Sequence, residues 1–233
     1  MGNSTAKLTE DNQGYWDRIK RARSWVDRAR ALESEDIQTN GGTNCQELFI
    51  IYWIAFNAMY GRINERDRGR YLRPGDDDAR WFLRRMCDLD TGVGRIHSGL
   101  TALRKEGHAL LKSIYLSEAY WREGCSPKLK RDLEEKTTAV EQALDAGDIH
   151  PYVTALLWER IRILRNQIFH GCSTNRDSLN KDALDSALRV LGMLIPLFIE
   201  TMENRVDKET DWPRIPFPRR GSPQHPKARD SRE

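Results

Sequence analysis

The chain has 233 residues, of which 39% are hydrophobic and 31% are charged, and its formal net charge is only +3. This length allows one sizeable core, and the small net charge excludes a basic field over the whole molecule. Its 28 arginines against 10 lysines suit contact with phosphate or nucleic acid, although GC-rich coding DNA produces the same bias.

The four cysteines do not form a recognisable binding or disulfide pattern. They lie about 40 residues apart with no C-x-x-C pair, at Cys45, Cys87, Cys125 and Cys172. This spacing predicts neither a disulfide framework nor a zinc knuckle. The polar N-terminus lacks the apolar region of a signal peptide, and the longest apolar run, 48–56, is shorter than the ~20 residues that span a bilayer. The sequence therefore predicts a cytoplasmic protein without a membrane segment.

The first third of the chain predicts two long helices and an arginine-rich loop. Apolar residues recur at helical spacing over 10–33, which predicts an amphipathic helix. A second helix, from residue 43 or 44 to Gly61, is apolar on all sides and is expected to be the buried centre of a bundle. The loop 61–75 follows, and the three acids at 76–78 then open a short helix, where they serve its cap and dipole or hold a metal.

Four further helical segments and a tail complete the predicted domain. The segments span 96–122, 127–146, 150–170 and 178–206, with a kink expected before Pro196 in the last. From residue 207 onward the chain holds five of its nine prolines and no apolar period, which predicts disorder. The fold expected is an all-α, multi-helix bundle over 10–206 with a Pro/Arg-rich disordered tail at 207–233.

The strongest candidate for chemistry lies near the end of the 150–170 helix. There, Arg165, Asn166 and His170 fall within six residues and precede Gly171, a typical helix terminator. Arginine grips phosphate oxygens with its planar fork, and histidine exchanges protons near neutral pH. This combination serves phosphodiester cleavage without a metal, whereas the structural alternative is a terminal histidine that caps carbonyls.

Helical angles place this motif away from the stripe that the helix buries. Asn166 and His170 lie opposite the apolar stripe that runs from Val153 to Ile168, on a face that also carries Leu156 and Ile163. A helix with two apolar faces has a second partner. That partner is either another helix of the bundle or the same helix of a second subunit, and the latter would create a composite site in a homodimer.

Other candidate residues concern RNA contact. Candidates for RNA binding are Arg162 on the motif helix and, in the loop, Arg66, Arg68, Arg70 and Arg73. The alternative for the loop is a solvated segment without a ligand. Asn57, amid apolar residues, is interpreted as a buried amide that could also reach the site. No residue cluster predicts a metal site or a bound cofactor.

Two stretches of the chain resemble a known family. The run from Arg165 to Gly171 (R-N-Q-I-F-H-G) closely resembles the signature of the HEPN superfamily. The run from Trp53 to Gly61 (W-I-A-F-N-A-M-Y-G), about 100 residues earlier, resembles a segment of the Apea-like HEPN group. The resemblance covers roughly 10–206 and implies a helical bundle that dimerises with its motif helices facing each other.

The resemblance also implies an activity. Many HEPN proteins are metal-independent ribonucleases that act as toxins or in abortive infection against phage. Carried over by position, Arg165 and His170 would be catalytic and Asn166 would orient them, with the ribose 2′-OH attacking the adjacent phosphate. Such toxins often have a partner protein encoded nearby. Those silenced by tyrosine modification carry a tyrosine where this chain has Cys172, which argues against that control. The alternative is a non-catalytic module for RNA or nucleotide binding or for dimerisation.

Overall fold

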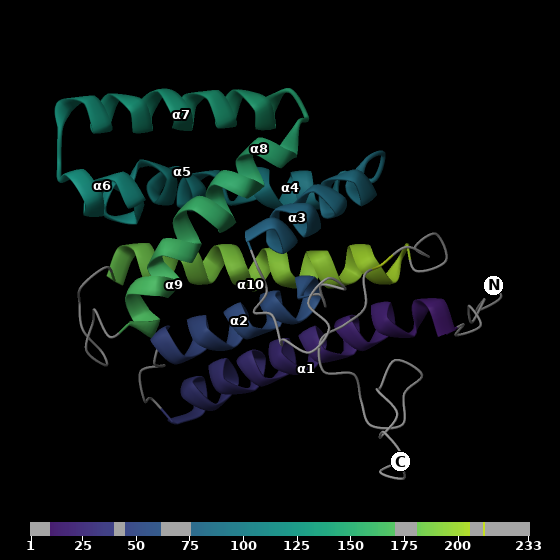
Figure 1. Ribbon diagram of the computed structural model, residues 1–233. Coiled ribbons are helices and arrows are strands. Elements are labelled where there is room, and N and C mark those ends of the chain that lie inside the picture. The colour runs from purple at the N-terminus through teal and green to yellow at the C-terminus, as the bar shows by residue number, and fades with distance from the viewer. Residues whose placement is uncertain (1–9, 40–44, 62–75, 171–180, 206–211, 213–233) are drawn as a thin grey trace, which may run out of the picture.

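The structure is a computed structural model that describes residues 10–39, 45–61, 76–170, 181–205 and 212. Every regular element in these ranges is a helix, so the predicted all-α class is confirmed. The helices form a bundle in which α1, α2 and α10 lie on one side and α7 on the opposite side, with α3, α4, α5 and α8 between them (Figure 1). None of the described helices is long and apolar enough to cross a membrane.

Three long helices form the main part of the core. The amphipathic helix α1 (Glu10–Thr39) continues six residues beyond its predicted end. The apolar helix α2 (Cys45–Tyr60) packs between α1 and α10 (Lys181–Glu203), as expected for a central helix. The large aromatic residues of α2 are at most 4% exposed, among them Tyr52, Trp53 and Tyr60. Pro196 lies inside α10, which continues for another seven residues to Glu203.

The predicted single segment over 96–122 is wrong. After α3 (Asp76–Asp90), the chain forms these short elements: α4 (Arg95–Ala102), α5 (Arg104–Lys112), the 3-10 turn η2 (Ile114–Leu116) and α6 (Glu118–Glu123). The backbone leaves helical geometry at Leu103 and becomes extended at Ser113 and Ser117. Leucines remain buried on both sides of the breaks at Leu103 and Ser113, so the apolar spacing continues there where the helix does not, whereas α6 has no buried residue.

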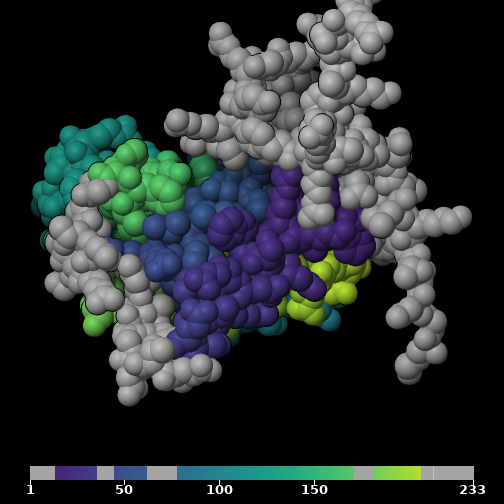
Figure 2. Space-filling view, turned by 90° about the horizontal axis from the view of Figure 1, so that it is seen from below, coloured from purple at the N-terminus to yellow at the C-terminus, as the bar shows by residue number. Residues whose placement is uncertain are grey.

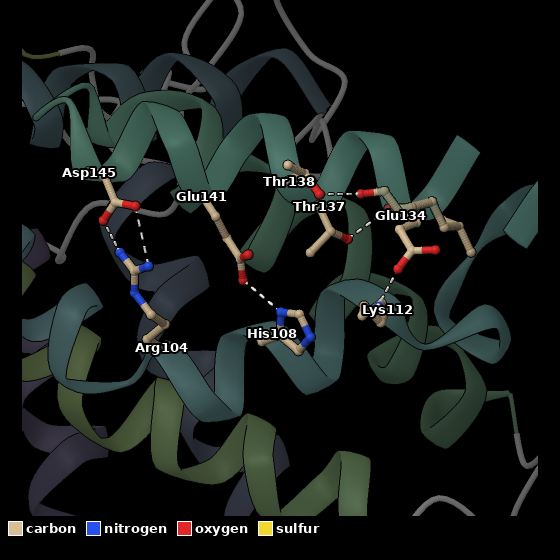
Figure 3. A network of polar contacts seen from close by, with 9 residues as sticks. Arg104, His108, Lys112, Glu134, Thr137, Thr138, Glu141 and Asp145 are labelled. Carbon is tan, nitrogen blue, oxygen red and sulfur yellow. Dashed lines mark hydrogen bonds and ion pairs between the residues drawn. The ribbon is translucent and has the colours of Figure 1, made fainter. Parts of the chain in front are cut away.

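The helix α7 (Pro127–Asp145) begins where its sequence signal predicts. The Ser126 hydroxyl accepts a hydrogen bond from the Leu129 N–H at 3.1 Å, and Pro127 occupies the first turn. A row of ion pairs joins α7 to α5 (Figure 3): Arg104 with Asp145, His108 with Glu141, and Lys112 with Glu134. Exposed pairs contribute little to stability, so the buried side chains of α7 carry more of this packing.

The predicted motif helix is one continuous helical stretch with an irregular middle. It comprises α8 (Ile149–Val153), a π-helix (Thr154–Ile161) and α9 (Arg162–Phe169). A π-helix has a wider turn, so angles drawn at 100° per residue do not hold across it. Leu156 and Ile163 are 0% and 6% exposed within this single chain. The bundle itself therefore covers the apolar second face, and a second subunit is not needed to bury it.

One residue assigned to the tail belongs to the core. Trp212 is 8% exposed, and its ring lies against Tyr15 and Trp81 at centroid distances of 4.8 and 5.1 Å. The core thus extends beyond the predicted boundary at residue 206. The remainder of the predicted disordered tail, 207–211 and 213–233, lies outside the described residues.

Candidate active site

The motif residues lie together at the surface, where α9 ends. Arg165 and Asn166 are half-buried on the last two turns, and His170 is exposed immediately after the helix. The His170 backbone N–H donates to the Asn166 carbonyl at 3.0 Å, which closes the final turn. From below, the green surface of α9 lies open beside the teal surface of the region around α6 and α7 (Figure 2). The predicted catalytic residues therefore share one accessible helix end.

Contacts on both sides hold the Arg165 guanidinium in place. One terminal nitrogen donates to Asn166 Oδ1 at 2.9 Å, and the guanidinium carbon lies 4.4 Å from the centroid of the Phe169 ring. Arg165 Nε is buried, and no hydrogen-bond partner for it exists among the described residues. A cation stacked on an aromatic face keeps a fixed plane, and Asn166 fixes one edge of that plane. The guanidinium is thus oriented and retains donor capacity for an anion.

Arg162, a predicted RNA contact, is engaged within the bundle. Its side chain donates to Glu118 of α6 at 2.5 Å and to the Trp158 carbonyl at 3.0 Å, and it lies over the Trp158 ring. These contacts connect α9 to α6 rather than presenting a free cation. The other predicted RNA contacts are Arg66, Arg68, Arg70 and Arg73. All four lie outside the described residues.

Asn57 is half-buried rather than buried, and its side chain bonds to another side chain. Its side-chain oxygen accepts a hydrogen bond from the Tyr60 hydroxyl at 2.5 Å, and the Tyr60 ring contacts the Trp158 ring at 6.4 Å. Trp158 lies twelve residues before His170 in the chain. Asn57 is therefore linked through Tyr60 to the middle of the motif helix.

Sequence reasoning missed a buried arginine that anchors the motif helix. Arg160, in the π-helix, is 5% exposed and donates to the carbonyls of Leu111 and Leu116 at 3.1 and 3.4 Å. Burial lowers the pKa of this guanidinium below its ordinary value. The bonds fix the ends of α5 and η2 against the motif helix. The available signal was a charge one residue before Ile161 and three or four residues after the apolar Leu156 and Leu157.

The other described histidines make contacts away from the end of α9. His97 Nε2 lies 3.0 Å from the Leu144 carbonyl, His108 pairs with Glu141, and His150 Nε2 lies 3.4 Å from the Thr154 hydroxyl. The parts of the chain that the structure describes hold no group of three or more His, Cys, Asp or Glu side chains placed to bind a metal ion. His170 is thus the described histidine at the helix end that carries Arg165.

Comparisons with known proteins add no relative. No protein-family model matches the chain, and no curated protein or solved structure matches it either. The likeness to HEPN proteins therefore rests on the two stretches Trp53–Gly61 and Arg165–Gly171.

Proposed function

We propose that this protein is a HEPN-type endoribonuclease that acts in the cytoplasm, in phage defence, abortive infection or a toxin system. One observation carries the proposal. Arg165 is oriented by Asn166 and by the Phe169 ring, and the exposed His170 follows on the same helix end. An oriented cation and a proton carrier at the same helix end match what cleavage of a phosphodiester requires.

The proposed reaction follows from the chemistry of these groups. The imidazole of His170 takes the proton of a ribose 2′-OH, and the 2′-oxygen attacks the neighbouring phosphorus. Arg165 donates hydrogen bonds to the oxygens of the phosphorane, where negative charge accumulates. The bond to the 5′-oxygen then breaks, that oxygen receives a proton, and a 2′,3′-cyclic phosphate remains. No metal ion is required for any of these steps.

The reaction supports a homodimer through the motif helices. One histidine does not accept the 2′-OH proton and protonate the leaving 5′-oxygen at the same moment, and the other described histidines are engaged elsewhere. A second copy would supply a second His170. Phe169, 46% exposed at the helix end, offers apolar area for such a contact. The surface buried within the chain at Leu156 and Ile163 does not contribute to it.

The decisive experiment measures cleavage of purified RNA in EDTA by the wild-type protein and two variants. We expect Arg165→Ala and His170→Ala each to lower the rate about 100-fold or more. His108→Ala is the matched control, because His108 is also exposed but pairs with Glu141 on α7. Cleavage that persists in both motif variants would contradict the assignment.

The same preparations separate the alternative functions. RNA or nucleotide binding without cleavage would identify a non-catalytic binding module. If the protein neither binds nor cleaves RNA but sediments as a stable dimer, it is a dimerisation protein. In cells, we expect expression of the wild-type chain to arrest growth and His170→Ala to relieve that arrest.

A further inference from the structure

Three aromatic side chains form an exposed cluster beside the motif helix. Tyr115, in η2, and Trp121, in α6, are 50% and 60% exposed, which is unusual for such large apolar surfaces. Tyr120 lies between them, with its ring 5.1 Å from each of the other two rings. The two edge-to-face contacts with Tyr120 leave half or more of the Tyr115 and Trp121 surface exposed, so the cluster offers aromatic surface to solvent.

A single carbonyl joins this aromatic cluster to the motif. The Tyr115 carbonyl accepts a hydrogen bond from the Gln167 side chain at 2.9 Å and another from the Trp121 indole N–H at 2.8 Å. Gln167 stands between Asn166 and His170 in the motif itself. A second connection is the ion pair between Arg162 of α9 and Glu118 of α6. The cluster therefore has a fixed position relative to Arg165 and His170.

Basic groups lie around the aromatic cluster. Arg122, next to Trp121, is 71% exposed and shares the carboxylate of Glu118 with Arg162, so that one acid faces two cations. Tyr115 also lines a hollow of about 500 Å³ between α5 and the start of α10, with Lys181 and Asp182 at its wall. The hollow exceeds the size of one nucleobase, and Lys181 offers an ammonium group to a phosphate.

We propose, on the basis of the ribonuclease function proposed above, that the aromatic cluster stacks the unpaired bases of single-stranded RNA next to the cleavage site. Every base has a π-face, so stacking on Tyr115 and Trp121 tolerates any sequence but requires bases free of a duplex. Arg122 and Lys181 contact the backbone of the same strand. The substrate is thus single-stranded RNA, and paired RNA is excluded because its bases are already stacked.

Two substitutions test this role without disturbing the carbonyl that anchors the cluster. Tyr115→Leu removes the ring and keeps the backbone oxygen that Gln167 and Trp121 use. Trp121→Leu removes the indole, whereas Trp121→Phe loses the N–H but keeps a face for stacking. Trp25→Leu is the matched control, since Trp25 is an exposed aromatic residue on α1, away from α6.

The assay measures binding by fluorescence anisotropy, with the full chain and a labelled, unstructured oligonucleotide that is 2′-O-methylated throughout and so cannot be cleaved. We expect Tyr115→Leu and Trp121→Leu each to weaken binding roughly 5- to 100-fold. Trp121→Phe should weaken binding less than Trp121→Leu does, and Trp25→Leu should bind with the affinity of the wild type. The same oligonucleotide annealed to its complement should bind weakly to every protein.

Cleavage of unmodified RNA distinguishes failure of this role from failure of the enzyme. Raised KM with nearly unchanged kcat in the two leucine variants supports the stacking role. If both variants bind RNA as the wild type does and have its KM, the stacking role is overturned, while the proposed ribonuclease activity still stands. If the wild-type protein binds RNA but does not cleave it, and the leucine variants lose that binding, the stacking role is supported and the proposed ribonuclease activity is overturned. A change from dimer to monomer in Trp121→Leu, with RNA binding retained, would instead make the cluster an interface between copies and overturn the proposal.

Discussion

At the scale of single residues, Tyr152 on α8 carries a buried hydroxyl for which the described residues offer no hydrogen-bond partner. Burial raises the pKa of this phenol to about 12. Replacing Tyr152 by phenylalanine removes a polar group to which no described residue hydrogen-bonds. We therefore expect Tyr152→Phe to leave the free energy of unfolding at pH 7 unchanged or to raise it by up to about 1 kcal/mol.

The same substitution should change how stability depends on pH. The phenol has a pKa near 10 in the unfolded chain and about 12 in the fold, so below pH 10 it is neutral in both states. Between pH 10 and 12 the unfolded chain loses the proton first, and the free energy of unfolding falls as pH rises. Tyr152→Phe should reduce this fall in urea titrations. Tyr52, whose pKa is also raised to about 12 by burial, should maintain part of it. An unchanged slope would contradict the account.

A second prediction at this scale concerns Asn166. Its side-chain oxygen accepts a hydrogen bond from Arg165, and aspartate would keep that acceptor while adding a negative charge. The resulting ion pair would neutralise the cation that is proposed to bind phosphate. We expect Asn166→Asp to lower kcat/KM for RNA at least about tenfold, with an unchanged melting temperature. Activity equal to that of the wild type would show that the free charge of Arg165 is not needed.

At the scale of elements, α5 and α8 approach closely where α5 has Gly107. A Cβ added to Gly107 would overlap the Tyr152 hydroxyl oxygen and lie 3.1 Å from its ring carbon Cζ. We expect Gly107→Ala to destabilise the protein by about 1–3 kcal/mol, as overpacking of a core does. The Tyr152→Phe background should restore part of the loss, because the overlapping oxygen is gone. Equal losses in both backgrounds, measured by urea unfolding, would argue against this contact.

The sequence predicts elements well where end signals are local. Ser126 and Pro127 locate the start of α7, and Gly61 marks the end of α2. The break at Ser113 carries no comparable signal, because the buried leucines on its two sides, Leu110, Leu111 and Leu116, follow a spacing that one long helix would also show. Beyond the break at Ser117, α6 has no buried residue. The π-helix is equally invisible, since the ladder of hydrogen bonds shifts by one residue without a change in composition.

The candidate site also has features that the local sequence predicts and features that depend on how distant elements pack. The positions of Arg165, Asn166 and His170 on one helix end follow from helical spacing and from the glycine after them. The bond from Gln167 to Tyr115 depends on how η2 packs against α9, which local pattern does not determine. The predicted apolar second face was assigned with regular helical angles. The π-helix and the neighbouring helices instead bury Leu156 and Ile163 within the chain.

At the scale of the whole molecule, the proposed dimer predicts that an inactive copy harms an active one. If each reaction uses His170 from both copies, a heterodimer of wild type and His170→Ala lacks either the acid or the base. Cleavage per wild-type chain should then fall as His170→Ala is added in excess, with substrate kept above the total protein concentration. An enzyme that acts as a monomer would show no such loss.

A matched control separates subunit exchange from competition for RNA. Phe169, exposed at the end of α9, is the apolar residue expected at the contact between copies. Glutamate there would place two acids against each other in a two-fold dimer. The double variant Phe169→Glu/His170→Ala should therefore sediment as a monomer and leave wild-type cleavage unchanged. Because Phe169 also contacts Arg165, the RNA affinity of the double variant is measured beside that of His170→Ala, and the comparison is made at concentrations where both bind equal amounts of RNA. Equal inhibition by His170→Ala and by the monomeric double variant would attribute the effect to RNA competition and remove the support for a shared site.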